Sequence, residues 1–362
     1  MKRRELIAAG AATVLTGCAG SRQDCAGATA GSTQYDWKLV TTWPPNFPGL
    51  GTGVVKLANM IETASGGRMK IRVYAAGELV PPFEVFDTVR SGAAEMGHGS
   101  AYYWKGKSEA AQFFTSIPFG MTATERNGWF YDGGGLELYR ELYEPFNLMP
   151  FPAGNTGVQM GGWFNREINS IADLQGLKMR IPGLGGEVLK RAGGTPVNLP
   201  GAEIFTALQT GSIDATEWIG PYNDVAFGLN KAARYYYYPG WQETGPTLEC
   251  IVNREAFLAL PDDLQSIIEI ACSAINDQMT AEFMARNASS LQQLRDDGDV
   301  EIRAFPQDVL QELKKFTRQV IAELVERDPA AAKINRSFEP FRNRVAEWSN
   351  LSERAILNTR DI

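Results

Sequence analysis

Two glutamates lie beside aromatic residues in a region that is also rich in turn-forming residues. Glu217 directly precedes Trp218, and Glu243 follows a run of four tyrosines and a Pro-Gly-Trp turn. An amide, Gln159, and a guanidinium, Arg180, occur upstream. Carboxylate and amide oxygens are ligands for hard cations, and an arginine can hold a carboxylate through two parallel hydrogen bonds. These five residues predict a site that binds a small organic acid through a cation.

Each of these residues also has an ordinary structural interpretation. Arg180 would form a surface ion pair, Gln159 would hydrogen-bond within the fold, and the two glutamates would lie in solvated loops. Tyr102 and Tyr103 follow a predicted strand at a position typical of a ligand cleft, and their structural alternative is core packing.

Catalytic motifs are scarce in this sequence. His98 is the only histidine, so a Ser-His-Asp or Cys-His arrangement would depend on it alone, and we expect it to be structural or at the cleft edge. The glycine runs at 133–135 and 183–186 lack the spacing and the lysine of a phosphate loop. An enzyme that uses Glu217 and Glu243 as a carboxylate pair remains an open alternative.

Charge and cysteine content exclude further classes of function. The 362-residue chain has a net charge of −7 without a basic stripe, which argues against a nucleic-acid partner. Besides Cys18, three cysteines remain without regular spacing and without a Cys/His cluster, so neither a disulfide framework nor a structural zinc site is expected.

The N-terminus has the pattern of an export signal. Three basic residues precede a short apolar stretch that is too short to span a bilayer, and Leu-Thr-Gly-Cys at 15–18 resembles a bacterial lipobox. We therefore expect a lipoprotein signal peptide at 1–17, a lipidated Cys18, a flexible tether at 18–34 and a periplasmic, membrane-anchored protein. An ordinary signal cut within 26–30 is the alternative, and the adjacent arginines faintly resemble a twin-arginine signal.

The remaining sequence alternates between strand and helix patterns. Strands are predicted at 37–42, 69–74, 94–99, 158–164, 177–181 and 247–253, and helices at 53–65, 82–92, 185–192 and 202–210, with largely helical sequence from 261. This pattern favours an α/β fold with two lobes, a ligand cleft between them and long C-terminal helices. We place lobe 1 at 35–156 plus about 249–285, and lobe 2 at 157–248 plus about 286–350.

Five motifs resemble the solute-binding proteins of tripartite ATP-independent periplasmic (TRAP) transporters, of the DctP-like family. They are Gly-Glu-Leu-Val-Pro at 77–81, the segment 154–164, Gly-Leu-Lys-Met-Arg at 176–180, Ile-Asp-Ala-Thr-Glu-Trp at 213–218, and Tyr-Tyr-Tyr-Tyr-Pro-Gly-Trp at 235–241. The resemblance extends from about residue 37 to the C-terminus and is greatest to the subclass that binds 2-oxo acids with a metal ion.

The resemblance implies a role for each site residue. Arg180 matches the arginine that pairs with the ligand carboxylate. Gln159, Glu217 and Glu243 match side chains at the metal, and Trp218 matches a residue that supplies its backbone carbonyl. We also expect Tyr102 and Asn155 to contact the ligand. The cation would be sodium or, second, calcium, and it would separate the carboxylates from an anionic ligand that they would otherwise repel. The acidic Glu187, close to Arg180 in sequence, departs from the family pattern, so the residues at the side-chain end of the pocket are left unassigned.

The implied function is transport without chemistry on the ligand. A 2-oxo acid such as pyruvate would be captured and delivered to the TRAP permease subunits, and relatives in the subclass form dimers through exchanged C-terminal helices. A calcium-dependent binder of lactate or another 2-hydroxy acid is the alternative within the class. A lipoprotein enzyme and a sensor subunit for a signalling receptor are the alternatives from other classes.

Overall fold

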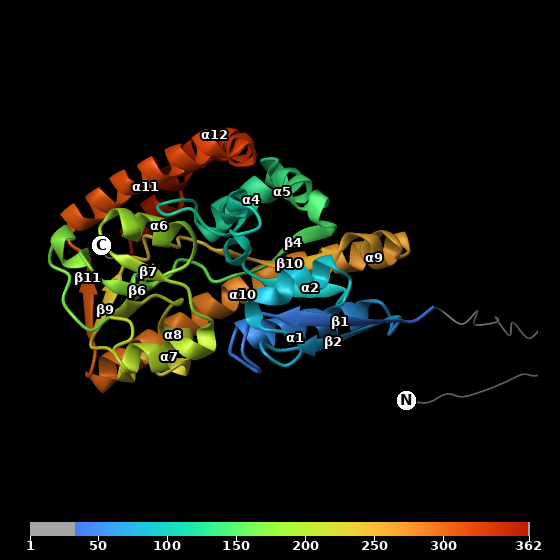
Figure 1. The fold of residues 1–362 in the computed structure, drawn as a ribbon, viewed down its shortest axis with the longest axis horizontal. Coiled ribbons are helices and arrows are strands. Elements are labelled where there is room, and N and C mark those ends of the chain that lie inside the picture. The colour runs from blue at the N-terminus through green and yellow to red at the C-terminus, as the bar shows by residue number, and fades with distance from the viewer. Residues whose placement is uncertain (1–32, 361–362) are drawn as a thin grey trace, which may run out of the picture. The chain divides into compact units, whose positions relative to one another are not determined.

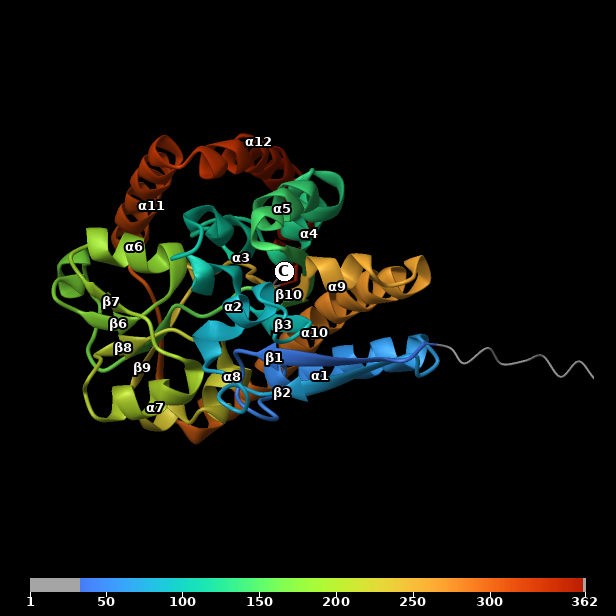
Figure 2. The ribbon, with the colours of Figure 1, turned by 45° about the vertical axis from the view of Figure 1, so that its right-hand side comes forward.

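A computed structural model describes residues 33–360 of the chain, and residues 34–362 belong to one compact unit. Two β-sheets organise this unit (Figures 1 and 2). The strands are β1 Tyr35–Thr41, β2 Met69–Tyr74, β3 Met96–Gly99, β4 Leu148–Asn155, β5 Gly162–Phe164, β6 Lys178–Arg180, β7 Thr195–Val197, β8 Ala215–Thr216, β9 Tyr235–Tyr238, β10 Thr247–Asn253 and β11 Glu301–Ala304.

The helices cover both faces of the two sheets. The α-helices are α1 Leu50–Ala64, α2 Val85–Arg90, α3 Gln112–Thr115, α4 Ala123–Asp132, α5 Gly135–Tyr143, α6 Gly183–Arg191, α7 Gly201–Gln209, α8 Pro221–Ala226, α9 Arg254–Leu258, α10 Asp262–Asp297, α11 Gln307–Arg327, α12 Pro329–Leu351 and α13 Glu353–Asn358. Short 3-10 turns are η1 Pro82–Glu84, η2 Ala101–Trp104, η3 Glu109–Ala111, η4 Glu144–Phe146, η5 Ile171–Leu174 and η6 Leu229–Lys231.

The first sheet has the order β2-β1-β3-β10-β4. Strands β1, β2 and β3 are parallel, as the alternation of strand and helix patterns predicted, because each is followed by a crossover helix or turn. Strand β10 is antiparallel to both neighbours, so the segment predicted at 247–253 does return to this sheet.

The second sheet has the order β11-β9-β5-β8-β6-β7. The strand expected at 158–164 is shorter than predicted, and only β5 is a strand there. The amides of Gln159 and Gly161 donate instead to Glu243 and Tyr237, so residues 156–161 form a crossover between the sheets. The tyrosine run at 235–238 forms strand β9.

We call each sheet with its covering helices a lobe. Each of the two hydrophobic cores contains residues from both lobes: Val89 and Leu189 share one core, while Val54 and Ile204 share the other. Helix α10 contacts β4, α1 and α8 and therefore extends from one lobe to the other. The two-lobed α/β architecture with long C-terminal helices is confirmed.

The C-terminal helices also contact both lobes. Helix α11 packs against α6 of the second lobe, and α12 packs against α4 and α5 of the first, forming an arch (Figure 2). The residue boundaries proposed for the lobes stay a prediction. Among residues 33–360, no helix combines the length and apolar character needed to cross a membrane.

Candidate functional site

The predicted site residues come from strand ends and from the two crossover segments between the lobes. Arg180 ends β6, and Thr216 lies opposite it on the parallel strand β8, so Glu217 and Trp218 emerge beside the arginine. Gln159 belongs to the crossover between β4 and β5, and Glu243 to the one between β9 and β10. The fold therefore brings together the five residues that the sequence singled out.

Arg180 is fully enclosed at this point, with 1% of its surface exposed. Its Nη1 donates to the Glu217 carboxylate and, at 3.3 Å, to the Glu217 main-chain carbonyl. Its Nη2 lies 3.4 Å from the hydroxyl of Tyr103 in the first lobe, and its guanidinium carbon lies 5.1 Å from the Trp218 ring centre. The surface-pair interpretation of Arg180 is thus wrong, because its carboxylate partner is equally buried.

Two buried oxygens at the site have no hydrogen-bond partner. The Gln159 amide nitrogen donates to the Thr156 hydroxyl at 3.1 Å, which leaves its Oε1 unpaired. Oε2 of Glu217 is likewise buried without a partner. Because an unpaired buried acceptor costs about 1–3 kcal/mol, two of them on candidate site residues point to a cation or donor that binds there.

Electrostatics at the site favour the same conclusion. Burial raises the pKa of Glu217 to about 7, while the Arg180 charge opposes the rise. Burial and the neighbouring Glu217 charge raise the pKa of Glu243 well above its usual range. Three buried carboxylates, on Glu217, Glu243 and the nearby Asp224, face two buried arginines, Arg180 and Arg126. One negative charge is in excess when all of them are ionised, and a bound cation would neutralise it.

The donor set fits a hard cation. Amide and carboxylate oxygens suit sodium or calcium rather than zinc, which prefers nitrogen and sulfur ligands. Among the described residues, no group of three or more His, Cys, Asp or Glu side chains is placed to hold a metal, and both described cysteines are buried free thiols.

A cavity of about 10 Å³ lies between the lobes at this site. That is about the volume that one water molecule needs, so the lobes enclose the site tightly. The side chains that line it are Trp43, Leu50, Ser100, Tyr102, Tyr103, Thr156, Gln159, Trp218, Ile219, Glu243, Pro246 and Leu248. Tyr102, predicted as a ligand contact, lines the cavity.

Trp43 lines the cavity but was missed by sequence analysis. It follows β1, and the signal that would have found it is its place after the carboxyl end of a parallel strand, where ligands bind in α/β sheets. Its indole N–H donates to Nδ1 of His98 at 2.8 Å, and Nε2 of His98 lies 3.0 Å from the Ala153 carbonyl. Burial lowers the pKa of His98 to about 4. His98 is thus a neutral, structural residue.

Two other residues named in the sequence analysis, Asn155 and Glu187, use their side chains for contacts within the protein. The amide of Asn155 bonds within the protein: Nδ2 donates to the Gly245 carbonyl at 3.1 Å, and Oδ1 accepts from Gly157 at 2.8 Å. Its role as a ligand contact stays a prediction. Glu187 is not in the cavity lining; its half-exposed carboxylate pairs with Lys105.

The fold and the site together define a two-lobed binding protein that encloses a small anion between its lobes. The family comparison supports the same class. Residues 39–328 match the family described as bacterial extracellular solute-binding protein, family 7 (DctP). The chain belongs to this family, whose members are binding proteins of transporters and not enzymes.

Similar proteins are known in several bacteria. The monocarboxylate 2-oxoacid-binding periplasmic protein of Nostoc sp. strain PCC 7120 is 42% identical over 99% of this chain and 98% of its own length. A TRAP periplasmic solute-binding protein from Pseudoalteromonas atlantica T6c, solved with sodium and pyruvate, is 43% identical with a TM-score of 0.88, covering 90% of this chain and 99% of that one.

A third similar protein shows a different cation and ligand. The TRAP transporter solute-binding protein from Bordetella bronchiseptica RB50 is 38% identical with a TM-score of 0.89, covering 91% of this chain and 97% of that one. It was solved as a mixed-occupancy dimer, with copurified calcium and picolinate in one active site and the other site empty.

Proposed function

We propose that this protein captures a small 2-oxo monocarboxylate, such as pyruvate, in the periplasm and delivers it to the membrane subunits of a TRAP transporter. The observation that carries the proposal is the buried pair of Arg180 and Glu217, together with unpaired buried oxygens on Glu217 and on the cavity-lining Gln159. A guanidinium for the carboxylate and an oxygen cage for a cation are the two elements needed to hold an acid with a neighbouring carbonyl.

Each residue of the site has a distinct task in this proposal. Gln159, Glu217, Glu243 and the Trp218 main-chain carbonyl would hold the cation. When bound, the cation offers a positive centre to the ligand carboxylate and to its 2-oxygen. Arg180 binds the carboxylate, and its position is fixed because its Nε donates to the Leu199 carbonyl at 3.2 Å. The protein changes no bond of the ligand.

Closure of the lobes would exclude water from the ligand. Aromatic rings from both lobes form the cavity wall, and Trp43 and Trp218 approach edge to face with 6.4 Å between ring centres. The cavity has room for about one water molecule in this structure, so the lobes must move apart to admit an acid, and pyruvate requires a smaller adjustment than longer 2-oxo acids. The cation is proposed to be sodium first and calcium second, and lactate with calcium is the second candidate ligand.

Tryptophan fluorescence tests the proposal directly, because two tryptophans line the cavity. Protein lacking residues 1–18 would be titrated with pyruvate in sodium buffer, in calcium buffer, and after removal of both cations. A saturable change that needs a cation, and that Arg180→Ala abolishes, is the expected result. A response that persists without any cation would contradict the bridging role of the metal.

We further propose that Cys18 carries a lipid anchor. Residues 1–32 lie outside the described residues, so the support is the lipobox at 15–18 and the small, polar segment that follows it. Mass spectrometry of the membrane fraction would detect an acylated N-terminal cysteine. Release of the Cys18→Ser variant into the soluble periplasmic fraction is expected, and unchanged membrane retention would refute the anchor.

We also propose that the protein forms a homodimer. Large apolar side chains on α12 and α13 are exposed, among them Trp348 at 68% and Leu351 at 80%. Exposed apolar groups of this size mark interaction surfaces when they cluster. The dimeric Bordetella bronchiseptica protein supports a second copy of the chain as the partner.

A further inference from the structure

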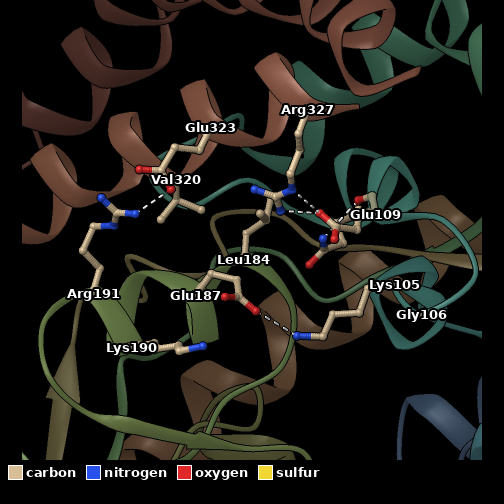
Figure 3. A pocket seen from close by; sticks show the side chains of 11 residues that line it. Lys105, Gly106, Glu109, Leu184, Glu187, Lys190, Arg191, Val320, Glu323 and Arg327 are labelled. Carbon is tan, nitrogen blue, oxygen red and sulfur yellow. Dashed lines mark hydrogen bonds and ion pairs between the residues drawn. The ribbon is translucent and has the colours of Figure 1, made fainter. Parts of the chain in front are cut away.

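A cavity outside the ligand site lies between three parts of the fold. It has a volume of about 650 Å³, and both lobes and α11 contribute to its lining (Figure 3). Lys105 comes from the first lobe, Glu187 from α6 of the second, and Arg327 from α11. In Figure 3 the charged ends of Lys105 and Glu187 point toward each other, while Arg327 points toward Glu109.

This cavity leads toward the ligand site. A small cavity of about 70 Å³ is lined by Tyr102, Lys105 and Gly183. It shares Lys105 with the outer cavity and Tyr102 with the site between the lobes. The three cavities are therefore neighbours in a row, and we take the outer cavity to be the mouth of the cleft, with Lys105 between this mouth and the site.

An ion pair joins the lobes at this mouth. Nζ of Lys105 lies 3.1 Å from Oε1 of Glu187. Lys105 directly follows η2, which carries Tyr102 and Tyr103, and α6 with Glu187 begins three residues after Arg180. Lys105 is thus close in sequence to Tyr102 and Tyr103 of the first lobe. Glu187 is close in sequence to Arg180 of the second lobe. The pair can form only when those two segments approach, which is the motion that encloses the ligand.

We infer that Lys105 and Glu187 form a latch across the cleft mouth that slows the escape of the bound acid. This inference rests on the proposed function, because it assigns the latch to the closure of the same site. The two residues are positioning residues: they touch each other and not the ligand. Both are about two-fifths exposed, at 43% and 41%, so their attraction is weakened by solvent and salt.

The expected effect is therefore modest and dependent on salt. Exposed pairs contribute up to about 1 kcal/mol, which corresponds to an increase of about 1.5- to 5-fold in the pyruvate off-rate when one partner is lost. At high salt, where the Debye length falls to about 3 Å, wild type and variants should converge. A residue with only a structural role would not show this convergence.

Stopped-flow fluorescence on the cation-loaded protein tests the latch through a double-mutant cycle. Lys105→Met and Glu187→Gln should each raise the off-rate at low salt, the double variant should add little more, and the exchanged pair K105E/E187K should restore slow release. The matched control is Lys333→Met, whose partner Glu141 lies on α5 of the first lobe, so that ion pair does not cross the cleft. Off-rates that match the control, or effects that simply add, would overturn the latch.

Hydrogen exchange on the ligand-free protein separates this inference from the proposed function. Lys105→Met should speed amide exchange in both segments, 101–107 and 183–191, at low salt. Exchange that changes only around the substituted residue would refute the latch, even if pyruvate binds. A wild-type protein that ignores pyruvate but shows the coupled exchange would instead retain the latch and refute the ligand assignment.

Discussion

The main-chain amide of Gln159 donates a hydrogen bond to the carbonyl oxygen of Glu243, with 3.1 Å between the two atoms. The bond joins the two crossover segments that connect the lobes. In return, the Gly240 amide donates to the carbonyl of Gln159 at 3.0 Å. Two of the proposed cation ligands, Gln159 and Glu243, therefore lie on the connection itself, where a bound ion would fix the geometry of both crossovers at once.

Removal of the Gln159 amide oxygen should weaken cation binding without preventing folding. Gln159→Ala deletes one unpaired acceptor and leaves the main-chain bonds of the crossover in place. We expect the cation affinity to fall by at least roughly 10-fold, the loss that even a supporting partner of a metal site causes. The measurement is the rise in melting temperature with added sodium or calcium, and Gln112→Ala, a buried glutamine of α3 whose amide nitrogen donates to the Glu109 carbonyl, is the comparison. An unchanged cation response would exclude Gln159 as a ligand.

Arg180→Lys should abolish tight pyruvate binding while retaining the fold. Lysine keeps the positive charge beside Glu217 but cannot present the planar pair of donors that a carboxylate requires. We expect the affinity to fall by about 100-fold, or ~3 kcal/mol, within the range for truncating one partner of a buried charge pair. Isothermal titration would measure it, with Arg140→Lys in an exposed ion pair as the control. Equal affinity in both variants would contradict the carboxylate role of Arg180.

Sequence patterns named candidate residues that the fold brings together, but they placed the surroundings of these residues less well. Arg180 and Glu217 come together because Arg180 ends β6 and Glu217 follows the neighbouring parallel strand β8. Glu187 could not be placed, because its direction depends on the rotation of α6 about its own axis. The crossover at 156–161 resembled a strand because its apolar residues do not reveal that its amides bond to another segment.

Missed helices have a similar explanation. Helix α4 carries many polar residues and lacks a clear apolar stripe, although a capping box of Thr122 and Glu125 marks its start. Helix α5 does have an apolar face, which includes Tyr139 and Tyr143, and the sequence analysis overlooked it. Their burial comes from α12, which folds back over them from the far end of the chain. Contacts between segments so distant in sequence are set by tertiary packing, which local periodicity does not encode.

Loss of one aromatic stack should speed ligand release. Phe47 of the first lobe stacks on Phe227 of the second, with 4.1 Å between ring centres and 26° between planes. Aromatic pairs contribute about 0.5–1.5 kcal/mol beyond their buried area. Phe227→Leu should therefore raise the pyruvate off-rate by about 2- to 10-fold, measured by stopped-flow fluorescence. The control is Phe257→Leu, because Phe257 pairs with Phe151 inside the first lobe. A larger effect of the control would argue against the role of the stack in closure.

Stability should depend on pH through a carboxyl group remote from the site. Glu249 on β10 is buried and accepts hydrogen bonds from the Trp104 indole and the Tyr139 hydroxyl. Burial raises its pKa from 4.5 to about 7, with those bonds opposing the rise. The folded state then binds more protons than the unfolded state between these values, so this group's contribution to stability is present below pH 4.5 and is lost as pH rises through 7.

Glu249→Gln isolates this contribution because glutamine stays neutral. The difference in unfolding free energy between wild type and variant should shift by roughly 1–3 kcal/mol between pH 5 and pH 8, with wild type losing more stability at pH 8. Urea unfolding at both pH values measures it, and other titrating groups cancel in the difference. Parallel pH dependence in the two proteins would show that Glu249 is already ionised in the folded state.

The exposed apolar residues of the C-terminal helices should control the association of two chains. Trp348 and Leu351 lie on the last turns of α12, and Ile356, 58% exposed, continues the apolar surface on α13. Protein lacking residues 1–18 should sediment as a dimer, and the combined change W348S/L351S should shift it toward the monomer. Because these positions are exposed in the single chain, the variant should keep the unfolding free energy of the monomer within about 0.5 kcal/mol.

The control is Leu79→Ser, an exposed apolar residue of the first lobe at 46%. A wild-type monomer at tens of micromolar concentration would refute the dimer, whereas dissociation in both variants would assign the interface to a broader surface than these helices.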